Sequence, residues 1–118
     1  MSYLYRCIFS LVIAIALFYF SPLAQAQTLF EMGVNRLIDS NYQAAITNFT
    51  RAIALREDVA EAYLNRCNAR IELADYRRAI TDCTTAINLA NNSIEPLLSR
   101  SIAYYRQGDY QAAIIIAP

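Results

Sequence analysis

An internal repeat runs through this sequence from Ala26 onward. Units that begin at Ala26, Ala60 and Ile94 align without a gap. The positions that recur in all three are a tyrosine (Tyr42, Tyr76, Tyr110), an alanine (Ala45, Ala79, Ala113) and the isoleucine after it (Ile46, Ile80, Ile114). The resulting period of about 34 residues is typical of helical arrays in which each unit packs on its neighbours.

Each unit has the pattern of two amphipathic helices joined by a short turn. In the second unit, residues 61–73 and 76–87 carry apolar or small side chains at helical spacing. Asp58 followed by Glu61 predicts a capping box at the start of the first helix. In every unit, the residue directly before the second helix is a good N-cap residue (Asn41, Asp75, Asp109). The sequence therefore predicts an all-α fold.

This part of the chain resembles tandem tetratricopeptide repeats. The shared features are the 34-residue unit, a small residue inside the first helix (Gly33, Cys67, Ser101), the early tyrosine of the second helix, and a late alanine (Ala52, Ala86). The resemblance implies a right-handed α-solenoid of helix-turn-helix units. About 2.7 repeats are present, over residues 27–59, 60–93 and an incomplete 94–118.

The sequence departs from the family pattern at several positions. The proline that usually closes a repeat is replaced by Glu57 and Asn91, while Cys67 and Cys83 stand where the family variant prefers Gly and an aromatic residue. The third unit stops at its 25th position, with the apolar run Ile114–Pro118 and no polar capping helix. Because a solenoid needs about three repeats and a polar cap, we interpret the sequence as a fragment of a longer chain. The alternative is that self-association through this apolar end completes the stack.

The resemblance implies a non-catalytic scaffold that binds a protein partner on the concave face formed by the first helices. The positions expected to face inward are Phe30, Val34, Leu37, Leu64, Asn68, Ile71, Leu98, Ile102 and Tyr105. Eight of these nine are apolar or aromatic, so the groove suits an apolar helix or an extended peptide of the partner. The alternative is that missing repeats or a second copy cover this face, because exposed apolar patches of this extent are uncommon.

The family's carboxylate clamp is not expected here. Its positions correspond to Phe30, Val34, Asn65, Glu95 and Ser99, and only Asn65 has a suitable side chain.

The composition excludes much of enzyme chemistry. The chain has no His, so it lacks Ser/His or Cys/His catalytic pairs and imidazole metal ligands. We therefore expect no catalytic residue, no cofactor and no metal.

The charge pattern also opposes nucleic-acid binding. All 10 basic residues are Arg and are balanced by 10 acidic residues interleaved with them, which indicates a salt-bridged surface. Two other functions stay open, namely the regulatory part of a larger exported enzyme and, less favoured, a helical-repeat RNA binder. The RNA binder would have a period of about 35 residues and a basic inner face.

Two contacts are predicted between the helices of the second unit. Arg66 and Asp82 occupy positions at which an ion pair could form. Cys67 and Cys83 approach each other in the predicted core, either as a disulfide, which would stabilise the fold by about 3 kcal/mol, or as two small buried thiols.

The segment at positions 1–26 has the pattern of a secretory signal peptide. Arg6 precedes an apolar stretch at positions 8–20 that is interrupted only by Ser10, Ser21-Pro22 ends that stretch, and Ala24-Gln25-Ala26 resembles a signal-peptidase site. We therefore expect an exported protein, periplasmic or secreted, that starts at Gln27. The alternative is a chain anchored in the membrane by residues 8–20, although a span needs about 20 apolar residues.

Overall fold

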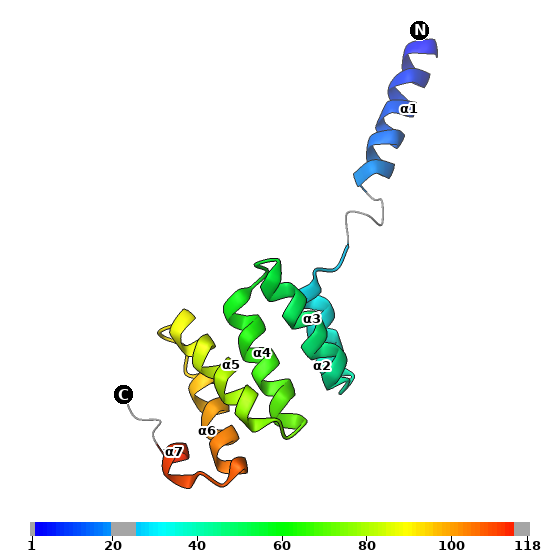
Figure 1. Cartoon of the computed structure of the whole chain (residues 1–118). Coiled ribbons are helices and arrows are strands. Elements are labelled where there is room, and N and C mark those ends of the chain that lie inside the picture. Colours follow the sequence, from blue (N-terminus) through cyan, green and yellow to red (C-terminus); the bar gives the residue numbers. More distant parts are fainter. Residues whose placement is uncertain (1, 20–25, 115–118) are drawn as a thin grey trace.

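The computed structural model describes residues 2–19 and 26–114, and within those ranges every regular element is a helix (Figure 1). The expected features at Ser21-Pro22 and Ala24-Gln25 lie outside the described residues, as do the last four residues of the predicted apolar end.

Helix α1 (Ser2–Tyr19) contains most of the predicted apolar run. Its side chains are exposed over residues 2–16. Among the described residues, no helix has both the length and the hydropathy that a membrane span requires.

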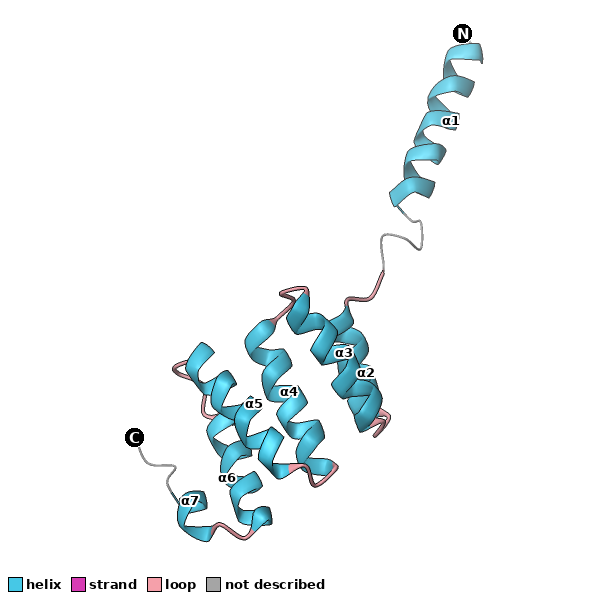
Figure 2. Ribbon diagram, in the orientation of Figure 1, coloured by secondary structure: helices cyan, strands magenta, loops and turns pink. Residues whose placement is uncertain are grey.

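The other six helices form three consecutive pairs. They are α2 (Leu29–Ile38) with α3 (Tyr42–Ala54), α4 (Val59–Glu72) with α5 (Tyr76–Leu89), and α6 (Glu95–Gln107) with α7 (Tyr110–Ile114). Each helix packs on the next one along the chain, and α4 also contacts both α2 and α6 (Figure 2). The first helices of the pairs therefore lie side by side. The prediction of an all-helical fold with packed neighbours is confirmed.

The turn inside each pair has the same backbone geometry. Ser40, Ala74 and Gly108 have φ values of 56°, 58° and 93°, and the three residues occupy the same position of the repeat. In each turn the amide of the following residue donates to a carbonyl five residues earlier, at 2.8 Å from Asn41 and 2.9 Å from both Asp75 and Asp109. The backbone thus reverses in the same way at each turn and starts the second helix at Tyr42, Tyr76 and Tyr110.

The helix caps agree with the sequence in part. The Oδ1 atoms of Asn41 and Asp109 accept hydrogen bonds from the first-turn amides of α3 and α7. Asp75 makes no such bond and instead pairs with Arg78 at 2.6 Å.

The capping box predicted for Asp58 and Glu61 is wrong. Asp58 has a φ of 41° and its side chain makes no cap hydrogen bond, because an N-cap side chain reaches the helix amides from an extended backbone, not a left-handed one. A capping box does form at the start of α2, where Thr28 and Glu31 exchange side-chain and backbone hydrogen bonds. The sequence interpretation missed this box.

Among the described residues the core forms two clusters, one inside each complete pair. Phe49 is the largest side chain of the first cluster, and Cys67 and Cys83 are central to the second. Ala69 of α4 belongs to the first cluster and Ala103 of α6 to the second. Each of these two complete pairs is therefore covered by a small side chain from the first helix of the next pair, which lets the backbones approach closely.

Candidate functional site

One hollow on the layer of first helices is an open cavity of about 320 Å³. Helix α2, the start of α3, α4 and α6 all contribute to it. The lining residues are Leu37, Tyr42, Asn68, Ile71, Glu72, Ser99, Ile102 and Arg106. The cavity thus collects side chains from the first helices of all three pairs, which α4 holds together through its contacts with α2 and α6.

The cavity combines an apolar wall with polar groups. Leu37, Ile71 and Ile102 supply aliphatic surface, and Ile71 is only 5% exposed. Asn68 and Ser99 add an amide and a hydroxyl, and Glu72 Oε1 lies 3.6 Å from Arg106 Nη1. Both of these charged side chains are nearly half exposed, so each can also contact a ligand. A few polar groups on an apolar wall are typical of binding hollows.

The nine residues predicted to share one groove are divided among the cavity, the two core clusters and a second hollow. Leu37, Asn68, Ile71 and Ile102 line the cavity. Leu64 lies in the second core cluster, while Phe30 and Val34 pack against the first. The remaining two, Leu98 and Tyr105, line a different hollow.

This second hollow lies between α6 and α7 and has a volume of about 520 Å³. Its lining, which we call the C-terminal face, consists of Leu98, Ser101, Ile102, Tyr105, Tyr110, Ala113 and Ile114. Five of these side chains are large, apolar or aromatic, and exposed by 45% to 74%. The rings of Tyr105 and Tyr110 meet edge to face, with centroids 5.3 Å apart. Ile102 lines both hollows.

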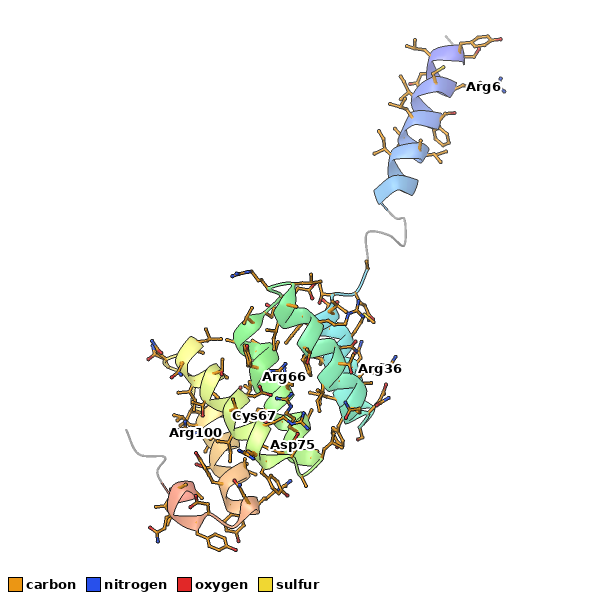
Figure 3. All side chains as sticks on the ribbon, viewed as in Figure 1. Arg6, Arg36, Arg66, Cys67, Asp75 and Arg100 are labelled. Carbon is orange, nitrogen blue, oxygen red and sulfur yellow. A yellow bond between two sulfur atoms is a disulfide. The ribbon has the colours of Figure 1, made fainter. Side chains whose placement is uncertain are left out.

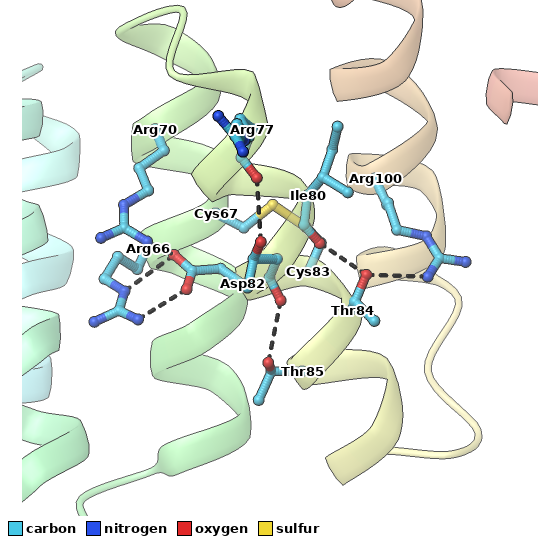
Figure 4. The surroundings of a disulfide bond; sticks show 11 residues. Arg66, Cys67, Arg70, Arg77, Ile80, Asp82, Cys83, Thr84, Thr85 and Arg100 are labelled. Carbon is cyan, nitrogen blue, oxygen red and sulfur yellow. Dashed lines mark hydrogen bonds and ion pairs between the residues drawn. A yellow bond between two sulfur atoms is a disulfide. The ribbon is translucent and has the colours of Figure 1, made fainter. Parts of the chain in front are cut away.

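A buried ion cluster joins α4 to α5 (Figure 4). Asp82 is almost fully buried and accepts from Arg66 Nε at 3.0 Å, from Arg66 Nη2 at 2.8 Å and from Arg70 Nη1 at 2.6 Å. The predicted pairing of Arg66 with Asp82 is confirmed, and Arg70 is an additional partner. Bidentate geometry fixes the orientation of the two helices more strictly than a single contact does.

The arginines also link successive pairs. Arg66 Nη1 donates to Thr50 Oγ1 at 3.0 Å, and Arg100 Nη1 donates to Thr84 Oγ1 at 3.2 Å. The two bonds occupy the same register of successive repeats, so the same contact ties α4 to α3 and α6 to α5.

A disulfide joins the residues next to the ion pair. The sulfur atoms of Cys67 and Cys83 are bonded, and their Cα atoms are 5.5 Å apart. The sequence left open either a disulfide or two buried thiols, and the structure contains the disulfide. Figure 3 shows Arg66 and Cys67 in the middle of the helical stack. The bridge and the Arg66–Asp82 pair involve neighbouring residues on each helix, and together they hold α4 against α5.

No protein-family model matches this chain, and the search of curated proteins also gives no match.

Several lining residues were missed by the sequence interpretation. Glu72 and Arg106 follow Ile71 and Tyr105 directly and share one register of the repeat. Their opposite charges at equivalent positions of neighbouring first helices were the available signal. Tyr42 was identified as a repeat position, but not as a lining residue of the cavity.

Proposed function

We propose that this chain is a non-catalytic binding scaffold of tetratricopeptide type, which holds a peptide segment of a partner protein in the cavity between α2, α4 and α6. The observation that carries the proposal is the cavity's lining, in which three successive first helices contribute both aliphatic and hydrogen-bonding side chains. In this proposal the helix pairs follow a right-handed superhelix, as in the family that the sequence resembles.

The side chains of the cavity suit a short peptide. An apolar peptide side chain would contact Leu37, Ile71 and Ile102, and the amide of Asn68 can both donate to and accept from a peptide backbone. Glu72 and Arg106 offer one charge of each sign at the margin. The proposed ligand is therefore an extended or helical segment with an apolar residue beside polar ones.

The construction of the central pair supports binding by a preformed surface. Helix α4 contributes Asn68 and Ile71 to the cavity, and it is fixed to α5 by the Arg66–Asp82 pair and by the disulfide. A rigid surface loses less conformational entropy when it binds, which favours affinity.

Export is part of the same proposal. The leader pattern of residues 1–26 supports it, and so does the bridge between Cys67 and Cys83, because disulfides persist in oxidising compartments.

The test is a selection of displayed random peptides on the purified full-length chain, followed by titration of the enriched peptides. Asn68→Arg places a long charged side chain in the cavity and should weaken binding by at least about tenfold, equivalent to about 1.4 kcal/mol. Asn88→Arg makes the same chemical change at an exposed position of α5 outside the cavity lining and should leave affinity unchanged.

Three results would contradict the proposal. Two of them are equal weakening by both variants and no weakening by either. The third is recovery of cleaved peptide after incubation, which mass spectrometry would detect, because a scaffold returns its ligand intact.

A further inference from the structure

We propose that the C-terminal face is a self-association surface, through which two copies of this chain pack symmetrically against each other. The inference does not rest on the proposed peptide cavity. It rests on a different hollow, which shares Ile102 with that cavity, and on a comparison between the helix pairs themselves.

The repeat register shows that the C-terminal face is built for helix packing. Its residues correspond, one repeat earlier, to Leu64, Cys67, Asn68, Ile71, Tyr76, Ala79 and Ile80. Six of those seven belong to the second core cluster or pack against it, and that cluster includes Ala103 of α6. In the central pair, the following helix α6 covers this surface. The equivalent surface between α6 and α7 has no such cover among the described residues.

The other end of a second copy does not fit this surface. The helices that cover a preceding pair present small apolar residues, Ala62 and Ala69 on α4, and Pro96 and Ala103 on α6, and all four are buried. At the equivalent positions the first pair has Thr28 and Asn35, which are polar and exposed. Thr28 is also engaged in the capping box. Head-to-tail stacking would therefore place polar groups against an apolar hollow at a free-energy cost.

A second copy can instead offer its own C-terminal face. The seven lining residues carry no formal charge, so a two-fold contact brings no like charges together. The five large exposed side chains present on the order of 500 Å² of surface per copy, which is the upper part of the range for the largest patch on a monomer. Two copies would bury about 1,000 Å², the lower limit for a specific interface. The result is a weak, closed dimer and not a filament.

Site-directed cross-linking of the full-length chain tests this geometry. Cys7 is the free, exposed cysteine of the described residues, so Cys7→Ser gives a background in which a new cysteine can be read alone. Ala113→Cys places a thiol in the C-terminal face, and Asn35→Cys places one at the opposite end of the stack. With a short bis-maleimide, we expect cross-linked dimer from Ala113→Cys and little from Asn35→Cys.

A charge variant then distinguishes association through the C-terminal face from nonspecific association. Tyr105→Glu, at a position 63% exposed, should abolish the Ala113→Cys cross-link. Gln107→Glu adds the same charge to α6 outside the C-terminal face and should leave the cross-link intact. Circular dichroism verifies that both variants keep their helix content. The proposal is overturned by equal cross-linking at both ends, by no cross-link at Ala113→Cys, or by a cross-link that survives Tyr105→Glu.

Discussion

Arg66 and Asp82 form a bidentate ion pair between α4 and α5, and each is the sequence neighbour of a cysteine of the disulfide between the same two helices. Asp82 is 2% exposed and also accepts from Arg70. One buried carboxylate therefore neutralises part of the charge of two arginines. Such a site is sensitive to loss of the acid, because the arginines would remain largely buried without a counter-charge.

Asp82→Asn should lower the free energy of unfolding by about 2 kcal/mol, less than for a fully buried pair because Arg66 and Arg70 keep partial access to water. Urea denaturation monitored by circular dichroism measures the change. Asp75→Asn is the matched control, since the Asp75–Arg78 pair is exposed on its arginine side and should contribute less than about 0.5 kcal/mol. Equal effects of the two substitutions would show that burial of Asp82 is not the cause.

The disulfide should stabilise the oxidised protein. The bridge closes a loop with a sequence separation of 16, for which the chain-entropy relation gives about 3 kcal/mol. Reduction, or a Cys67→Ala and Cys83→Ala double variant, should lower the unfolding midpoint in urea, while Cys7→Ser should not. Thiol labelling of the unfolded, non-reduced protein gives an independent result: reaction at Cys67 and Cys83 would contradict the bridge.

The shared turn geometry predicts opposite effects of two glycine exchanges. Ala74 has a φ of 58°, a conformation that costs a side-chain-bearing residue about 1 kcal/mol or more, so Ala74→Gly should stabilise the fold by up to about 1 kcal/mol. Gly108 has a φ of 93° with open space around it, so Gly108→Ala should destabilise by about 1 kcal/mol through the backbone alone. Urea unfolding of the two variants tests both signs. Changes in the same direction would refute the argument.

Gly33 has a different role, because it permits close packing. A Cβ atom at this position would lie 2.6 Å from Phe49 Cε1, and Phe49 is fully buried. Gly33→Ala should therefore destabilise by about 2 kcal/mol, as overpacking of a core does. Phe49→Leu in the same chain should recover part of this loss, and a double-mutant cycle measures the coupling. Strict additivity of the two changes would mean that the ring is not the obstacle.

Periodicity predicted the parts of this fold that depend only on position along a helix. The starts of α3, α5 and α7, the Arg66–Asp82 pair and the approach of Cys67 to Cys83 all follow from the repeat register. Asp58 shows the limit of such reasoning: its residue type suits an N-cap, but the loop gives it a left-handed backbone.

The candidate binding surface was predicted less completely, for a geometric reason. Register indicates which side of a helix a residue occupies, but not how far the neighbouring helices cover it. Leu64 and Leu98 share one register position, yet Leu64 is 9% exposed and Leu98 is 45% exposed. The difference arises because α6 packs over the central pair, whereas no described helix packs over α6 and α7 in the same way.

The bridge between Cys67 and Cys83 also changes how the molecule would respond to tension. A polypeptide pulled from its two termini extends by about 3.4 Å for each residue released. The segment between the two cysteines, which spans 16 positions with its ends 5.5 Å apart, would stay short, so the oxidised chain should reach a contour length about 50 Å below that of the reduced chain. The segment between the two cysteines would thus stay a closed loop of fixed length while the rest of the chain extends.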